Sequence, residues 1–237
     1  MAILWPEVTV FATAIGLPVA QASKPPAVWM QMSTATIYAH RFDVANDEAS
    51  GVLGGCEDGV PPYWAFSVQI AQAWEDTQAE AATPGTRKVA MRTAMVMSPD
   101  RGGVFDHLYW LARLGLGGPV AGGRQYISWI HDRDLVRAIE FLLERGDISG
   151  PVNLAAPGPL PQRRFMHELR ARMGVPVGVP AAGWMAEIGA FVIRSDTELL
   201  LKSRRVVPGR LRSAGFDFDF PHWPAAADDL VRRRKTG

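Results

Sequence analysis

The 237-residue sequence is poor in cysteine, in lysine and in metal-binding patterns. Cys56 is the only cysteine, which excludes a disulfide framework and a cluster of thiolate metal ligands. Lysine occurs only at positions 24, 88, 202 and 235, so few amines are candidates for catalysis. The histidines show no H-x-x-x-H or H-E-x-x-H spacing, and no metal site is expected.

Long apolar runs and an excess of charge of one sign are also missing. No apolar stretch reaches the ~18 residues that a membrane span needs. The formal net charge of +1 gives no basis for capturing nucleic acid or an anionic membrane. We therefore expect a cytoplasmic chain with neither of these as a partner.

Residues 1–23 have the apolar middle of a secretory leader, which is the alternative interpretation. They lack a positively charged start, however, and carry Glu7. Apolar residues recur there at helical spacing, at Val8, Phe11, Ile15 and Val19. The pattern favours a core helix, which Pro18 should kink or shorten.

Strand-like and helical patterns alternate over the first two-thirds of the chain. The predicted strands are 27–33, 86–97, the stretch "QYISWI" and the stretch "GPVNLAAPGP", and the predicted helices are 64–81, 104–114 and 134–145. This alternation predicts an α/β fold with a largely parallel sheet. Ligands in such folds bind at the carboxyl ends of the strands. Three later stretches, 160–174, 181–193 and 196–208, predict a mostly helical tail.

Four segments carry a likeness to a known family. They are "RTAMVMSPDRGG", "RLGLGGPVAGGRQYISWIHDRDLVRAIEFLLE", "SGPVNLAAPGPLPQRRFMHEL" and "LLKSRRVVPGRLRSAGFDFDFP". They resemble the atypical extended short-chain dehydrogenase/reductases, known as epimerase family proteins or NAD-dependent epimerase/dehydratases with a C-terminal domain of unknown function. The resemblance implies a partial Rossmann-like domain at 1–156 and a helical substrate domain at 157–237. It also implies NAD or NADP as cofactor and a small-molecule substrate.

Two features of that family are missing from the sequence. The opening G-x-x-G-x-x-G loop, which cradles the cofactor pyrophosphate, does not occur. No tyrosine has a lysine four residues later, and the two catalytic positions of the family fall on Ser67 and Ala71. We expect that the first βα units are missing, and that the open edge of the sheet favours a homo-oligomer. A non-catalytic binding or regulatory module of the same fold is the alternative.

The resemblance also assigns candidate site residues. Thr34 takes the position of the catalytic serine or threonine, although a strand-end residue that caps a turn explains it equally well. The remaining assignments are Ser33, Arg92 and Thr93 for the cofactor, and Tyr38, Met95, Trp129, His131 and Asn153 for the substrate. For His131 a structural role is favoured, as the cap of a helix that begins near Asp132. The basic stretch "RVVPGRLRSAGF" is expected to be a solvated surface.

Overall fold

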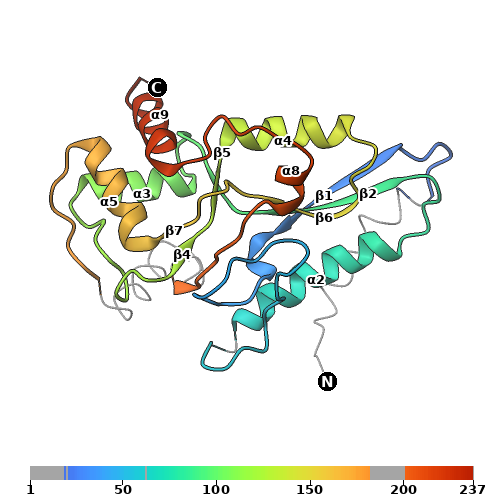
Figure 1. Ribbon diagram of the computed structural model, residues 1–237, viewed down its shortest axis with the longest axis horizontal. Coiled ribbons are helices and arrows are strands. Elements are labelled where there is room, and N and C mark those ends of the chain that lie inside the picture. The colour runs from blue at the N-terminus through green and yellow to red at the C-terminus, as the bar shows by residue number, and fades with distance from the viewer. Residues whose placement is uncertain (1–18, 20, 62, 182–200, 237) are drawn as a thin grey trace.

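The computed structural model describes residues 19, 21–61, 63–181 and 201–236 (Figure 1). The helix expected over residues 8–19 lies outside the described residues except for Val19, and the helix expected over 181–193 lies outside them except for Ala181. Within the described part of the chain, no helix is long and apolar enough to cross a membrane.

The centre of the fold is a parallel sheet of three strands. Its order is β1 (Val28–Thr34), β2 (Arg87–Thr93) and β6 (Gly150–Leu154). Met91 of β2 pairs with Met32 on one side and with Val152 on the other. The first strand was predicted over 27–33, and β1 begins and ends one residue later. The predicted α/β architecture is confirmed.

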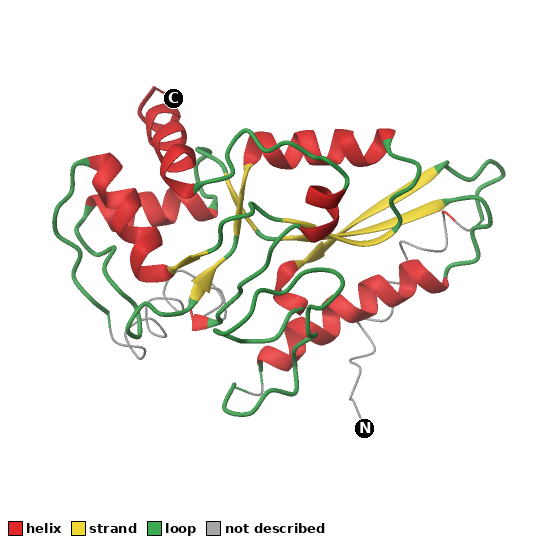
Figure 2. Ribbon diagram, in the orientation of Figure 1, coloured by secondary structure: helices red, strands yellow, loops and turns green. Residues whose placement is uncertain are grey.

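Helices cover both faces of this sheet. Helix α2 (Trp64–Glu80) lies on one face and helix α4 (Asp132–Glu144) on the other (Figures 1 and 2). Ala138 and Leu142 of α4 lie one turn apart, and both are fully buried with Val89 and Val152 of the sheet. Burial of a side chain such as Leu142 contributes about 1.5–3 kcal/mol, so this apolar stripe accounts for the position of α4.

The single strand predicted over 86–97 is wrong in one respect, because the chain changes partner at Ala94. The Ala94 amide donates to the carbonyl of Leu154, and the next three residues leave the sheet. They form β3 (Met95–Met97), which pairs in parallel with β5 (Trp129–His131). The stretch "QYISWI" is divided in the same way, since β4 (Tyr126–Ile127) pairs instead with β7 (Leu160–Pro161).

Helices α3 (Val104–Arg113), α5 (Gln162–Met173) and α9 (Trp223–Thr236) form a second apolar cluster beside the sheet. The short helices η1 (Ala35–Ile37) and α8 (Gly209–Ser213) pack in other clusters. Trp223 stacks on Phe165 at 3.8 Å between ring centroids. Because Phe105 and Trp129 belong to the same cluster, apolar packing is continuous across residue 156. The division into domains at that residue stays a prediction.

The helix predicted over 196–208 is wrong for residues 202–208, which are not helical. Neighbouring loops take up the backbone groups there. The Arg204 amide donates to the carbonyl of Tyr126, and the Val206 amide donates to the hydroxyl of Ser128 at 2.8 Å. These partners hold the segment extended against the core.

Candidate functional site

A cavity of about 210 Å³ lies at the carboxyl ends of β1 and β2. The described residues that line it are Thr34, Ala35, Thr36, Thr93, Ala94, Met95, Val104, Ser128 and Arg204. It is therefore at the end of the sheet where ligands bind in open α/β folds. Three of the nine predicted site residues, Thr34, Thr93 and Met95, line it.

Thr34 caps a turn, which is one of the two roles that the sequence left open, and it also lines the cavity. It is the last residue of β1 and the N-cap of the short helix η1, where its Oγ1 accepts from the Thr36 amide at 3.1 Å. A threonine hydroxyl satisfies one of the orphan amides at such a helix start. The cap fixes the orientation of the same side chain that lines the cavity.

Thr36, Ser128 and Arg204 belong to the cavity and were missed by the sequence analysis. The Arg204 guanidinium donates from Nη1 to Thr36 Oγ1 at 3.0 Å. Ser128 Oγ donates to the Arg204 carbonyl at 2.5 Å. Lys202 donates from Nζ to the Thr36 carbonyl at 2.9 Å. Only 5% of Arg204 and 2% of Lys202 is exposed, so two positive charges are buried beside one threonine.

The prediction that "RVVPGRLRSAGF" forms a solvated surface is also wrong in part, because the guanidinium groups of Arg205 and Arg210 bind backbone carbonyls. The Arg210 guanidinium donates to the carbonyls of Ser149 and Pro151 next to β6. The Arg205 guanidinium donates to the Asp43 carbonyl at 2.7 Å and lies over the Tyr126 ring. Arg210 thus joins the C-terminal segment to the edge of the sheet at β6, and Arg205 joins it to Asp43 and Tyr126. The segment "LLKSRRVVP" was part of the family resemblance and could have drawn attention to these residues. The sequence pattern does not show, however, which residues this segment contacts.

Four other predicted site residues, Ser33, Arg92, Tyr38 and Asn153, belong to one hydrogen-bond network that includes Glu75, and they do not line the cavity. Arg92 donates from Nε and Nη2 to the Glu75 carboxylate, at 2.9 and 2.7 Å. Ser33 Oγ donates to the same carboxylate at 2.7 Å. Arg92 Nη1 donates to the Tyr38 hydroxyl, which donates in turn to Asn153 Oδ1 at 2.9 Å. Burial raises the pKa of Tyr38, and the nearby Arg92 only partly offsets it.

His131 holds the start of α4, as the favoured interpretation predicted. Its Nδ1 accepts from the Arg133 amide at 3.2 Å and lies 2.9 Å from Asp132 Oδ1. Its Nε2 lies 3.2 Å from Asp229 Oδ2, and its ring stacks on Phe220. The side chain is fully buried. Trp129, also fully buried, belongs to the apolar cluster of α3, α5 and α9 and does not line the cavity.

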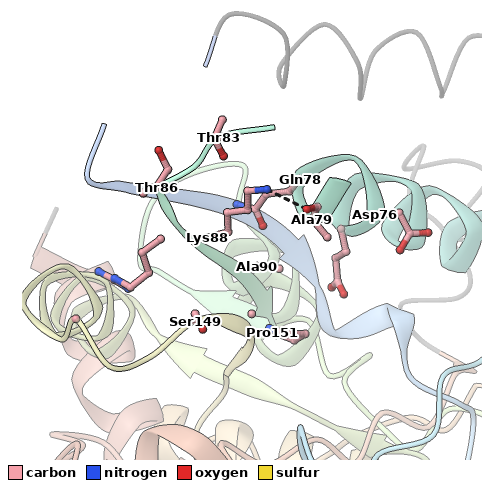
Figure 3. A pocket seen from close by; sticks show the side chains of 14 residues that line it. Asp76, Gln78, Ala79, Thr83, Thr86, Lys88, Ala90, Ser149 and Pro151 are labelled. Atoms are coloured by element: carbon pink, nitrogen blue, oxygen red, sulfur yellow. Dashed lines mark hydrogen bonds between the residues drawn. The ribbon is translucent and has the colours of Figure 1, made fainter. Parts of the chain in front are cut away.

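A larger hollow of about 830 Å³ lies at the opposite end of the strands. Its walls include the starts of β2 and β6 and the second half of α2 (Figure 3). Lys88 joins these walls by donating from Nζ to the carbonyls of Ala79 and Ala81, and Figure 3 shows the first of these bonds. Volume alone favours this hollow, but it is remote from the carboxyl ends where ligands bind. The smaller cavity is therefore the candidate site.

No group of three or more His, Cys, Asp or Glu side chains is placed to hold a metal ion in the described ranges. The site combines hydroxyls and one guanidinium with apolar side chains at the carboxyl ends of parallel strands. Fold and site together define a Rossmann-like α/β protein with a small-molecule cavity.

Comparisons with known proteins give the family. The chain is 32% identical over 216 residues to the bovine epimerase family protein SDR39U1, covering 90% of this chain and 68% of the relative. It is 33% identical over 194 residues to the Mycobacterium tuberculosis epimerase family protein MT2273, covering 79% and 63%. Residues 182–230 match the model of a domain of unknown function, DUF1731. The chain belongs to the epimerase family of extended short-chain dehydrogenase/reductases, with DUF1731 in its C-terminal part.

Solved structures agree. The crystal structure of human SDR39U1 (isoform 2) with NADPH matches at a TM-score of 0.82 and 26% identity, covering 95% of this chain and 72% of that one. A nucleoside-diphosphate sugar epimerase from Corynebacterium glutamicum matches at a TM-score of 0.69 and 24% identity, covering 95% and 43%. The second likeness shows the fold alone.

Proposed function

We propose that this protein binds NAD or NADP and acts as an oxidoreductase or isomerase on a small molecule. The observation that carries the proposal is the cavity at the carboxyl ends of β1 and β2, lined by Thr34, Thr93 and Met95. Support comes from the human relative, whose structure contains NADPH.

The described residues fit one end of such a cofactor. Thr34 and Thr93 offer hydroxyl oxygens to a flat polar ring, and Ala94 and Met95 offer apolar contact. A cavity of about 210 Å³ lies below the ~300–1,000 Å³ of pockets that enclose drug-sized ligands. It therefore fits the nicotinamide end of the dinucleotide and not the whole. The donors of Ser33 and Arg92 are committed to Glu75 and Tyr38, so we assign these two a positioning role.

When bound, the cofactor supplies a hydride donor or acceptor. The chain's own contribution is orientation and polarity. The Thr34 hydroxyl donates a hydrogen bond to a substrate oxygen. This bond stabilises negative charge that develops on that oxygen. The Thr93 hydroxyl donates to the Met91 carbonyl at 3.1 Å. This bond fixes the orientation of the Thr93 side chain where it faces the ring.

A binding module without catalysis is the second candidate. The residues at two positions of α2 favour it. The family's tyrosine and lysine positions fall on Ser67 and Ala71, and Ala71 is fully buried in a core cluster. Neither side chain supplies the proton transfer of the tyrosine and lysine pair.

The finer expectations for partners and location belong to the same proposal. Among the described strands, β1 pairs only with β2, which leaves one side of β1 for a second copy of the chain. The single exposed thiol of Cys56 fits the reducing cytoplasm.

Titration with NADPH and NADH tests the proposal, followed by nicotinamide fluorescence and by the thermal midpoint. Cofactor at ~100 Kd should stabilise the native state by roughly 2.7 kcal/mol. Adenosine 2′,5′-bisphosphate, which has no nicotinamide, is the control for binding at the adenosine end alone. No shift at millimolar NADPH and NADH, with a protein shown to be folded, would overturn the proposal. Saturable binding without turnover of any carbonyl substrate would leave the second candidate.

A further inference from the structure

A histidine outside the cavity is bonded to the segment that forms part of the cavity wall. His40 lies in the loop that follows η1, and its Nδ1 accepts from the Ser203 amide at 2.8 Å. Ser203 is fully buried, and the next residue along the chain is Arg204, which lines the cavity. The imidazole of His40 therefore helps to hold residues 202–206 in place.

The direction of this hydrogen bond fixes the protonation state of the imidazole. A backbone amide only donates, so His40 Nδ1 must present a lone pair, and the proton of the neutral ring is on Nε2. A protonated imidazole carries a proton on both nitrogens and accepts at neither. Protonation of His40 and the bond from the Ser203 amide therefore exclude each other.

Charged groups of both signs act on the His40 ring. Lys202 comes from the C-terminal segment and lowers the pKa of His40, whereas Glu57 comes from the loop before α2 and raises it. The Glu57 carboxylate also accepts from the His40 amide at 2.7 Å. Further charged side chains of this region are Arg41, Asp43 and Arg124. The charges of Lys202 and Glu57 thus oppose each other.

Burial of the His40 ring has the larger effect. The ring lies near two aromatic rings, with centroids 5.3 Å from Trp64 and 5.0 Å from Phe42. An imidazolium in such surroundings loses hydration, and burial is the largest influence on the pKa of His40. This pKa is lowered below the ordinary 6.5, so His40 is neutral at pH 7 and accepts the Ser203 amide.

We propose that His40 is a pH-sensitive switch, whose protonation breaks the bond from the Ser203 amide and loosens the segment that brings Arg204 into the cavity wall. The inference goes beyond the proposed function, and its test needs no cofactor. Ser203 Oγ donates separately to the Arg41 carbonyl at 2.8 Å, so the segment is loosened and not released. Because Arg204 Nη1 donates to Thr36 Oγ1, movement of the segment changes the cavity lining.

Nuclear magnetic resonance of the full chain measures both partners of the bond. In the neutral state, the ring nitrogen shifts of His40 should show a proton on Nε2 and none on Nδ1. The titration midpoint of His40 should lie below the ordinary 6.5. Over the same pH interval, the Ser203 amide should lose protection against hydrogen exchange. Protection factors are compared instead of rates, because intrinsic exchange itself depends on pH.

Variants separate the titration from the bond. His40→Asn offers a side-chain oxygen in place of Nδ1 and does not titrate, so it should keep the Ser203 amide protected across the pH interval. His40→Ala removes the acceptor and should lower the protection of that amide at neutral pH as well. His167→Asn is the matched control, because His167 is an exposed histidine of α5, and it should leave the pH dependence of Ser203 unchanged. The wild type and His40→Asn carry the test if His40→Ala does not fold.

The stability of the protein checks the sign of the effect. Because the folded-state pKa lies below the unfolded value, the stability from neutral His40 is fully present above pH 6.5. It is lost as the pH falls from there toward the folded value. From about pH 7.5 to about pH 5.5, the ratio of the wild-type to the His40→Asn unfolding constant should rise severalfold, and at most about tenfold.

Three results would overturn the switch. They are a proton on His40 Nδ1 in the neutral state, a His40 titration midpoint at or above 6.5, and a Ser203 amide whose protection does not follow that titration. A loss of Ser203 protection in His40→Asn as steep as in the wild type would overturn it as well. NADPH binding bears on the proposed function alone, because each of these measurements is made on the chain without cofactor.

Discussion

The ion pair between Arg92 and Glu75 should be a major local source of stability. Its side chains are only 9% and 12% exposed, and two hydrogen bonds join them. At 2.7 Å and an effective dielectric of about 20, their attraction is about 6 kcal/mol before the cost of desolvation. Removing one partner leaves the other charge buried, which costs about 3–5 kcal/mol. We expect a loss of that size from either Glu75→Met or Arg92→Met.

The double variant distinguishes a pair from two independent residues. With both charges replaced by apolar side chains, no uncompensated charge remains, and the loss should be far below the sum of the single losses. We expect a coupling energy of at least about 2 kcal/mol. Urea unfolding followed by tryptophan fluorescence measures it. A loss of ~4 kcal/mol lowers the midpoint by about 2 M when the slope is about 2 kcal/mol/M.

Glu80→Met is the matched control, because Glu80 is an exposed glutamate of the same helix. It should change stability by no more than about 0.5 kcal/mol. Losses from Glu75→Met and Arg92→Met that add up in the double variant would refute the reasoning. A loss from Glu75→Met as small as that of the control would do the same.

Two further predictions concern the start of α4. His131→Ala should lose the helix cap and leave a void beside Asp229, which should lower the free energy of unfolding by about 2–4 kcal/mol. His131→Asn should recover about 1 kcal/mol of this loss, because asparagine also caps a helix. Equal urea midpoints for the two variants would contradict the capping role. For Asp132, burial alone would raise the pKa, but the neighbouring His131 ring and the Arg233 guanidinium outweigh it and hold the pKa well below the ordinary 3.8. A depressed carboxyl pKa contributes stability that is present above about pH 4 and is lost as the pH falls through the folded value. The midpoint difference between wild type and Asp132→Asn should therefore be large at pH 7 and shrink at pH 3, and a difference independent of pH would rule this out.

Local patterns predicted the elements well, because they are set by neighbours in the sequence. The apolar spacing over 134–145 predicted a helix, and Ala138 and Leu142 of α4, four residues apart, are both fully buried. The division of the strand at Ala94 could not be predicted in this way. It depends on the Leu154 carbonyl, which lies 60 residues further along the chain and accepts the Ala94 amide. A continuous apolar run has the same periodicity whether its strand keeps one partner or changes to another.

The candidate site was predicted only where it lies on strand ends. Thr34, Thr93 and Met95 were assigned by the family resemblance, and they line the cavity at the carboxyl ends of the strands, where ligands bind in such folds. Thr36 and Arg204 were not assigned, because their contact joins residues 168 apart and requires the path of the C-terminal segment. The basic residues of that segment have the composition of a solvated surface. Only the tertiary structure shows that Arg204 is buried.

The contact between Thr36 and Arg204 also bears on what the C-terminal part contributes. Arg204 lies within the span that matches DUF1731, whereas Thr34 and Thr36 belong to the Rossmann-like part. If that C-terminal part only covered the cleft, its removal would expose the site without changing its chemistry. Because the Arg204 guanidinium occupies one acceptor position of the Thr36 hydroxyl, the C-terminal part contributes a residue to the cavity lining and fixes one of its hydrogen bonds. In this fold, the strand ends place the cavity, and the C-terminal part completes its wall through Arg204.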